Sequence, residues 1–431
     1  MIVSKKHIIE YFDSGIKEKK NFKIGVEHEK FLFNKKDNTR IDYLKIKEMF
    51  NALLEFGWNP ILEKENIIGL NNGEKNISLE PGNQIELSGE KLNHIHEACA
   101  ESQDYLFELR QVTKKLDINI VSAGFDPISK IDQIPNNPKL RYKLMNKYMP
   151  LGGEMSLDMM YRTCGTQLNL DYESENDFIK KFKIINSIVP ISIALFANSS
   201  IVEKKNSNYL SYRSKVWQST SRGGLPKIFF EELNFEKYAE FVMKFPILFI
   251  QEDENYISGK KYIFKDFMDG KISEINNRLP TKHDLSNHLS TIFTENRLKQ
   301  YIELRSMDTC GWDCLCAGPA FYTGILYGNL EEVYDLVSGW DKNKIINAYL
   351  EAPKNGFNTQ LMGKDLLYWA SNLLELGRKG LENRDILNRS GKNETIFLKH
   401  LQKVIDNKVT NADHMINKFS KNEDLSELYD K

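Results

Sequence analysis

Glutamates recur inside strand-like stretches of this sequence, and they are the residues that could most clearly take part in chemistry. In GVEHEKFLF (25–33) the side chains of a strand would alternate between two faces, so Glu27 and Glu29 share a face with Phe31 and Phe33. Two carboxylates placed in this way repel each other. The pair therefore indicates either a solvated face of a sheet, where charged residues usually lie, or a site where a cation binds between the acids.

A second acidic stretch, ISLEPGNQIELSG (77–89), carries Glu80 and Glu86 among isoleucine and leucine residues. Pro81 and Gly82 predict a turn or a bulge between the two acids. The apolar neighbours indicate a half-buried sheet, where a lone carboxylate is costly unless it is paired, protonated or bound to a metal. This setting weakens the interpretation of a purely solvated face.

Two later strand-like stretches add more oxygen atoms and an arginine. In TCGTQLNLDY the alternation places Gln167 and Asn169 on one polar face, with leucines on the other. In YIELRSMD the same alternation places Glu303 and Arg305 on one face. Four separate strands are therefore expected to present polar side chains.

Such faces would suit divalent cations together with a polyphosphate. Mg²⁺ binds oxygen ligands, and arginine clamps phosphate or carboxylate through two parallel hydrogen bonds. The sequence contains no G-x-x-x-x-G-K-[ST] motif, so phosphate binding would not be of the P-loop type. A network of cross-strand Glu–Arg pairs on a sheet surface is the alternative that the pattern leaves open.

The elements that must position these residues predict an α+β fold with a mainly antiparallel sheet. Strand patterns dominate the first third and return near 245–265 and 300–306, whereas helical patterns fill other stretches. We expect one catalytic unit over residues 1–431, with a sheet-containing core (1–325) and a helical C-terminal part (326–431).

Composition narrows the classes of partner. The 59 basic and 60 acidic residues nearly cancel, and no basic block marks a nucleic-acid surface. We expect no signal peptide and no membrane span, and hence a cytoplasmic protein. The five cysteines fit a reducing compartment without a disulfide framework, and the spacing of the last three matches no common zinc pattern.

Six motifs in the same order closely resemble the plant and proteobacterial type of glutamate–cysteine ligase. They are GVEHEKFLF, SLEPGNQIELSG, DMMYRTCGTQLNLDY, LFANSS, LSYRSKVW and RLKQYIELRSMD, and the likeness runs from about residue 22 to residue 325. The resemblance implies a glutamine-synthetase-like fold, with an antiparallel sheet curved into a cup and surrounded by helices. It also implies ATP-dependent ligation of the γ-carboxylate of L-glutamate to L-cysteine through a γ-glutamyl phosphate, the first step of glutathione biosynthesis. Mg²⁺ would be the cofactor, and ATP a substrate.

The resemblance also implies roles for individual residues. Metal-binding carboxylates would be Glu27, Glu29, Glu80, Glu86 and Glu303. Catalytic arginines that clamp substrate and phosphate would be Arg162, Arg213 and Arg305, and substrate contacts would come from Arg141, Tyr212, Trp217, Gln167 and Asn169.

The sequence departs from the family pattern after Trp217, where QSTSRGGLP is shorter than the usual loop and lacks its aspartates. It also has no cysteine between Cys164 and Cys310, so the hairpin disulfide of plant members is not expected. Two other functions stay open: a related ligase that joins glutamate to a different amine, and a non-catalytic homologue that binds nucleotide. A monomer and a homodimer are equally compatible with the sequence.

Overall fold

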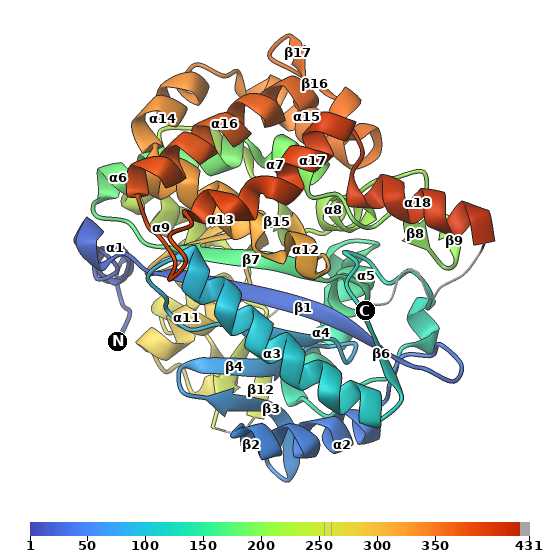
Figure 1. Ribbon diagram of the computed structural model, residues 1–431. Coiled ribbons are helices and arrows are strands. Elements are labelled where there is room, and N and C mark those ends of the chain that lie inside the picture. Colours follow the sequence, from blue (N-terminus) through green and yellow to red (C-terminus); the bar gives the residue numbers. More distant parts are fainter. Residues whose placement is uncertain (254, 260, 423–431) are drawn as a thin grey trace.

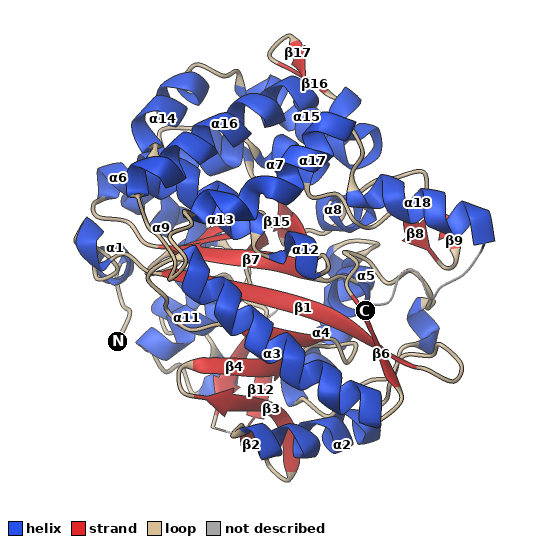
Figure 2. Ribbon diagram, viewed as in Figure 1, coloured by secondary structure: helices blue, strands red, loops and turns tan. Residues whose placement is uncertain are grey.

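A nine-stranded antiparallel sheet forms the centre of the molecule, as seen in the computed structural model, which describes residues 1–422 except 254 and 260. The strand order is β14-β15-β7-β1-β5-β4-β3-β2, and β6 pairs with the far end of β1. These strands are β1 (Ile24–Asn34), β2 (Asn59–Glu63), β3 (Asn66–Asn72), β4 (Lys75–Leu79), β5 (Ile85–Ser88), β6 (Ile118–Val121), β7 (Gly165–Leu170), β14 (Asn296–Leu298) and β15 (Ile302–Asp308). Helices surround this sheet (Figure 2), so the expected α+β class is confirmed.

The helices follow the periodic stretches of the sequence. They are α1 (Lys5–Asp13), α2 (Tyr43–Leu53), α3 (Ile95–Lys115), α4 (Leu140–Tyr148), α5 (Ser156–Arg162), α6 (Glu175–Ser187), α7 (Val189–Leu195), α8 (Tyr212–Gln218), α9 (Phe235–Lys244), α10 (Phe264–Met268), α11 (Lys282–Ser290), α12 (Trp312–Leu315), α13 (Ala317–Thr323), α14 (Leu330–Ser338), α15 (Lys342–Asn355), α16 (Leu366–Arg384), α17 (Lys399–Asn407) and α18 (Asn411–Asn422). Short two-stranded pairs complete the fold: β8 (Ile201–Val202) with β9 (Lys205–Asn206), β10 (Gly223–Gly224) with β13 (Phe293–Thr294), β11 (Phe249–Glu252) with β12 (Asn255–Ser258), and β16 (Gln360–Leu361) with β17 (Lys364–Asp365). No helix among the described residues is long and apolar enough to cross a membrane.

The side chains of β1 alternate between the two faces of the sheet, and the two faces have different neighbours. His28 lies on the face that α3 crosses (Figure 1), where its Nε2 is 3.0 Å from the hydroxyl of Ser102. Val26 belongs to the large core that includes residues of α6, α7 and the helices α13 to α16. Glu27 and Glu29 therefore point to the opposite face.

Register brings the acidic stretches together on that opposite face. Glu29 is directly opposite Glu86 on β5, and Glu27 is directly opposite Gln167 on β7. On the next strand, Glu303 of β15 is opposite Asn169 of β7. The predicted break at Pro81–Gly82 is present as the turn between β4 and β5, which returns the chain and places Glu80 at the turn.

The helical C-terminal part packs through glycines that allow helix backbones to approach closely. Gly324 lies in the segment between α13 and α14. A Cβ added to Gly380 of α16 would lie 1.9 Å from the carbonyl oxygen of Gly324. At Gly377, one turn earlier, the nearest atom to an added Cβ would be the Phe321 carbonyl oxygen at 3.3 Å.

Replacing Gly380 by alanine should therefore destabilise the protein, whereas alanine at Gly377 should be tolerated. Overpacking costs about 1–3 kcal/mol, which outweighs the ~1 kcal/mol gained when alanine replaces glycine in a helix. The free energy of unfolding, measured by denaturant titration of both variants, checks this. Equal stability of Gly380→Ala and Gly377→Ala would contradict the close approach.

Candidate active site

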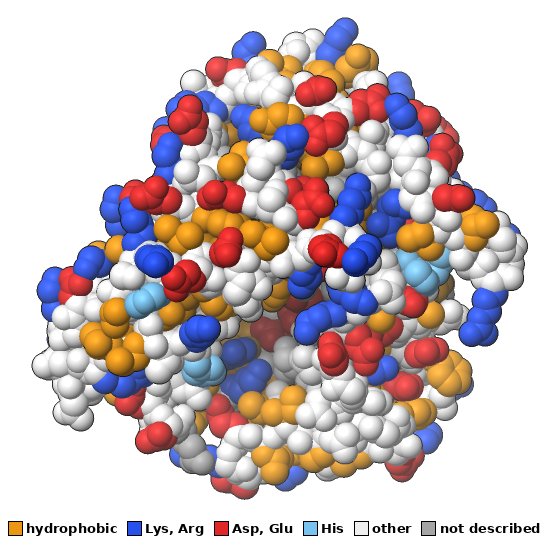
Figure 3. Space-filling view, turned by 90° about the vertical axis from the view of Figure 1, so that its left-hand side faces the viewer, with side chains coloured by type: hydrophobic (Ala, Val, Ile, Leu, Met, Phe, Trp, Pro, Cys, Tyr) orange, Lys and Arg blue, Asp and Glu red, His pale blue; other side chains and the backbone are white. Residues whose placement is uncertain are grey.

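A cavity of about 560 Å³ opens on the face of the sheet that carries the acids. All five glutamates of the predicted metal site line it, namely Glu27, Glu29, Glu80, Glu86 and Glu303. Figure 3 shows a hollow in the surface, with acidic side chains deep inside it and lysine or arginine near its edge. Acids that are distant in the sequence are thus gathered in one place.

The opposite wall of the cavity comes from outside the sheet and is largely apolar. It is formed by residues of α4, α5, α8, β11 and β13: Tyr142, Met145, Met159, Met160, Trp217, Phe249 and Phe293. The cavity therefore has a carboxylate-rich floor and an aromatic and methionine-rich wall, which is typical of a small-molecule site.

Glu303 differs electrostatically from the other acids of the floor. Its carboxylate forms ion pairs with Arg297 (2.6 Å), with Lys299 (3.3 Å) and with Arg305. Burial would raise the pKa of Glu303, but these three cations hold it well below its usual range. Glu303 is therefore ionised and already neutralised by protein side chains.

Glu27, Glu29 and Glu86 form no ion pair among the described residues, in contrast to Glu303. Burial and the nearby Glu303 raise the pKa of Glu27, and burial and Glu80 raise the pKa of Glu29 to about 7. Burial, followed by the charge of Glu27, raises the pKa of Glu86 well above its usual range. Their ionised forms need a cation.

These carboxylates fit Mg²⁺ by donor chemistry, although the described part of the chain holds no cluster of three His, Cys, Asp or Glu side chains close enough to form a ready-made metal site. Mg²⁺ usually binds one or two carboxylates together with substrate phosphates, so such a cluster is not required. Glu27, Glu29 and Glu86 are the residues that would hold it.

Five of the other predicted site residues also line the cavity: Arg141, Gln167, Asn169, Trp217 and Arg305. Arg305 bridges the floor, because its Nη1 donates to both Gln167 and Glu303. Its guanidinium also lies 5.2 Å from the ring of Trp217. Asn169 donates to Glu27 at 2.7 Å. Strand β7 thus orients Glu27 through Asn169, and orients Arg305 through Gln167.

Arg162, Arg213 and Tyr212 do not line the cavity. Arg162 is paired with Asp158 (2.9 Å) and Glu203 (3.3 Å), away from the floor. Arg213 lies directly behind the wall, where it donates to the carbonyl of Arg305 at 2.7 Å. Its guanidinium is 5.0 Å from the Trp217 ring. Tyr212 packs its ring on Phe125 at 4.8 Å.

Two cations of the site, Arg297 and Lys299, were not predicted. Arg297 donates to both oxygens of Glu303 from β14, where it is directly opposite Glu303 in register. The sequence RLKQYIE contains the signal, because Arg297 on a short strand and Lys299 just after it lie two positions apart shortly before the Glu303 strand. Recognising it requires the hairpin register.

The shortened loop after Trp217 is anchored by Arg222. Its Nε donates to the carbonyl of Thr291 (2.9 Å) and its Nη1 to the carbonyl of Pro246 (2.9 Å). Burial lowers the pKa of Arg222 to about 9. The loop is therefore fixed to Thr291, which lines the cavity, without the aspartates that the family pattern has there.

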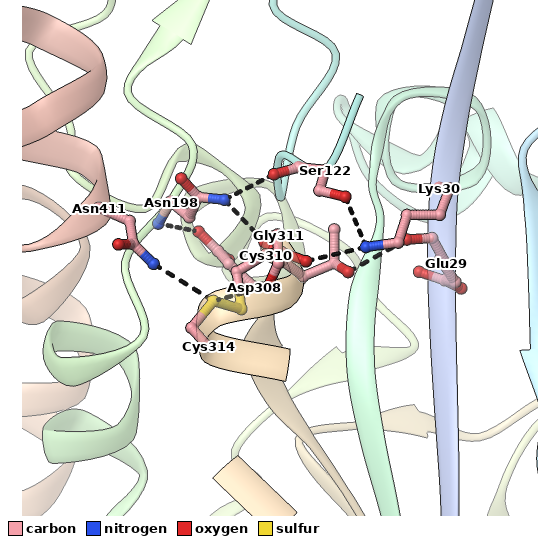
Figure 4. Close-up of a disulfide and its surroundings, with 10 residues drawn as sticks. Glu29, Lys30, Ser122, Asn198, Asp308, Cys310, Gly311, Cys314 and Asn411 are labelled. Carbon is pink, nitrogen blue, oxygen red and sulfur yellow. Dashed lines mark hydrogen bonds between the residues drawn. A yellow bond between two sulfur atoms is a disulfide. The ribbon is translucent and has the colours of Figure 1, made fainter. Parts of the chain in front are cut away.

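The expectation of unpaired cysteines is wrong. The structure pairs Cys99 with Cys316 and Cys310 with Cys314, and leaves Cys164 as a buried free thiol. Cys99 and Cys316 are 217 residues apart, and only the packing of α3 against the segment before α13 brings them together. Figure 4 shows the second pair at the end of β15, where Lys30 donates to the carbonyl of Cys310 at 2.8 Å.

The fold is shared with that of a solved ligase. The crystal structure of glutamate–cysteine ligase from Francisella tularensis in complex with AMP has the same fold, with a TM-score of 0.56. The match covers 94% of this chain and 86% of that chain at 14% sequence identity, so it bears on the fold alone.

Sequence comparison gives the particular family. The sequence model of glutamate-cysteine ligase family 2 matches residues 23–431. The chain is 39% identical over 421 residues to chloroplastic glutamate–cysteine ligase B of Oryza sativa subsp. japonica, covering 96% of this chain and 84% of the relative. It is 40% identical over 420 residues to the chloroplastic enzyme of Nicotiana tabacum, covering 96% and 79%. The chain belongs to glutamate-cysteine ligase family 2.

Proposed function

We propose that this protein joins the γ-carboxylate of L-glutamate to the amine of L-cysteine at the expense of ATP. Membership of the family supports the choice of substrates. The observation that carries the chemistry is the gathering of four half-buried glutamates and the buried Glu303 with Arg305 in one cavity. The floor is suited to a triphosphate with its cations, and the apolar wall to the remaining parts of the substrates.

The reaction has two steps. A γ-carboxylate oxygen of glutamate attacks the γ-phosphorus of ATP, the bond to the bridging oxygen breaks, and ADP leaves. The cysteine nitrogen then attacks the carbonyl carbon of the acyl phosphate, phosphate leaves, and the nitrogen loses a proton. No protein nucleophile takes part, so the protein acts by positioning and by electrostatic stabilisation.

The residues of the floor divide this work. Glu27, Glu29 and Glu86 would hold Mg²⁺, which when bound neutralises charge on the transferring phosphoryl group. Arg305 stays charged beside Glu303 and presents its guanidinium to anionic oxygens. Gln167 and Asn169 hold Arg305 and Glu27 in place. Helices α4 and α5 cover one side of the cavity and so reduce the access of water, which would otherwise hydrolyse the acyl phosphate.

Release of ADP should require both L-glutamate and L-cysteine. The assay supplies ATP, Mg²⁺ and L-glutamate, and offers L-cysteine, L-serine, glycine, L-alanine and ammonia in turn. We expect turnover with cysteine to exceed that with every other amine by at least ~10-fold in kcat/KM, because the site must discriminate side chains by contact. Faster turnover with another amine would identify a related ligase instead. Absence of ADP release with every amine would indicate a non-catalytic homologue.

A further inference from the structure

Arg305, the arginine of the cavity floor, is not held by the regular ladder of its strand. The pairing of β15 with β7 shifts between Leu304 and Met307, so the peptide of Arg305 lies at an irregularity. Its N–H donates to the carbonyl of Glu295 at 2.9 Å, and its own carbonyl accepts from Nη2 of Arg213 at 2.7 Å. Because bulges re-aim side chains, these two bonds fix where Arg305 points.

Glu295 and Arg213 are both buried, and the hydrogen bonds of their side chains go to other residues. Their exposed fractions are 1% and 2%. Nε and Nη1 of Arg213 have no hydrogen-bond partner among the described residues. Burial raises the pKa of Glu295, and the nearby Arg213 guanidinium offsets part of that effect. The two groups therefore attract each other electrostatically, and among the described residues no hydrogen bond joins their side chains.

The described residues offer the Glu295 carboxylate one hydrogen-bond donor, the hydroxyl of Tyr349 at 2.8 Å. Tyr349 is 4% exposed and belongs to α15, in the helical C-terminal part. Burial and the Glu295 charge raise the pKa of Tyr349 well above its usual range, so the hydroxyl keeps its proton and donates it.

A proline fixes Tyr349 against the helix that carries Arg213. Pro353 stands four residues after Tyr349 inside α15 and has no N–H, so it cannot donate to the Tyr349 carbonyl as a helical residue would. That carbonyl accepts the side-chain amide of Gln218 instead, at 2.5 Å. At the other end of α8, the N–H of Ser211 donates to the carbonyl of Pro353 at 3.0 Å. Helix α15 thus accepts hydrogen bonds from both ends of α8.

We propose that Tyr349 is a positioning residue for the reaction proposed above: its hydroxyl holds the Glu295 carboxylate, which leaves Arg213 free to hold the bulged peptide of Arg305. Without that hydroxyl, Nε and Nη1 of Arg213 become the groups that can donate hydrogen bonds to the Glu295 carboxylate. Pairing with Glu295 would turn the guanidinium away from the Arg305 carbonyl and release the floor arginine. The inference rests on the proposed function because Arg305 is assigned there to the substrates.

The test compares Tyr349→Phe with Tyr43→Phe in the full-length protein. Tyr43→Phe is the matched control, since it also removes one hydroxyl hydrogen bond (to Ile67, 3.1 Å) but lies outside the cavity. Tyr349→Phe should lower kcat/KM for L-glutamate by about 10-fold, the cost of one misplaced hydrogen-bonded contact. In protein labelled with ¹⁵N-arginine, the Nε resonances of Arg213 and Arg305, identified by Arg213→Lys and Arg305→Lys, should both shift. Tyr43→Phe should change neither quantity.

Glu295→Gln separates positioning from general loosening of the structure. If Tyr349 acts through the Glu295 charge, the double variant Tyr349→Phe/Glu295→Gln should be no slower than the slower single variant. Unmoved arginine resonances, unchanged kcat/KM or additive losses in the double variant would each overturn the proposal. Wild-type protein without cysteine-dependent ADP release would overturn the proposed function instead, while the arginine resonances would still report on the Tyr349 network.

Discussion

Replacing Glu29 by glutamine should lower kcat by at least about 100-fold, equivalent to ~3 kcal/mol of transition-state stabilisation. Glutamine keeps the shape of the side chain and can still accept the N–H of Gly165, which Glu29 binds now. It cannot supply the negative charge that holds a divalent cation beside the phosphates. The loss should therefore fall on the chemical step.

The same substitution should leave the protein as stable as before, or more stable by up to ~1 kcal/mol, when measured without Mg²⁺ and nucleotide. Glu29 faces Glu86 directly across two strands, and like charges in that position are destabilising. Steady-state kinetics at saturating Mg²⁺ and denaturant titration give the two quantities. The exposed Glu48 on α2 provides the control, since Glu48→Gln should change neither. Near-normal turnover of Glu29→Gln would remove Glu29 from the site.

Strand alternation in the sequence predicts which residues share a face on β1 and on β15, whereas the full set of floor carboxylates is what the family resemblance implies. Glu27 and Glu29 share a face because β1 is a regular strand, and Glu303 with Arg305 share one even though β15 is irregular beside them. Alternation is a local property with a period of two, so it can be recognised without knowing the partners. The α+β class follows in the same way from the order of strand and helix patterns.

Residues outside the sheet could not be placed by that argument. Arg162 precedes β7 at the end of α5, and its side chain finds Asp158 one helical turn earlier rather than the floor. Arg213 lies on α8, whose position depends on α15, more than a hundred residues later in the chain. Cys99 and Cys316 are likewise joined by tertiary packing alone. Contacts of this kind depend on how elements dock, which a local pattern does not encode.

Glu303→Gln should have the opposite effect on stability to Glu29→Gln, although the chemical change is identical. Glu303 is the counter-charge shared by Arg297, Lys299 and Arg305, and its loss leaves all three without it. Removing one partner from a buried ion pair typically costs about 3–5 kcal/mol. We expect the free energy of unfolding of Glu303→Gln to fall by about 3 kcal/mol, and activity to be lost because Arg305 is no longer oriented.

A second substitution can show that the cost comes from uncompensated charge. Arg297 should account for the largest part of that cost. It binds both oxygens of Glu303, and its Nη1 also donates to the Ser290 carbonyl at 2.7 Å. The double variant Glu303→Gln/Arg297→Gln should therefore recover part of the lost stability without recovering turnover, as seen by denaturant titration and ADP release. Full stability of the single Glu303→Gln variant would mean that the three ion pairs contribute nothing net. In that case the low pKa of Glu303 would no longer distinguish it from the cation-seeking acids beside it, and the division of the floor into a neutralised and a metal-binding half would fail.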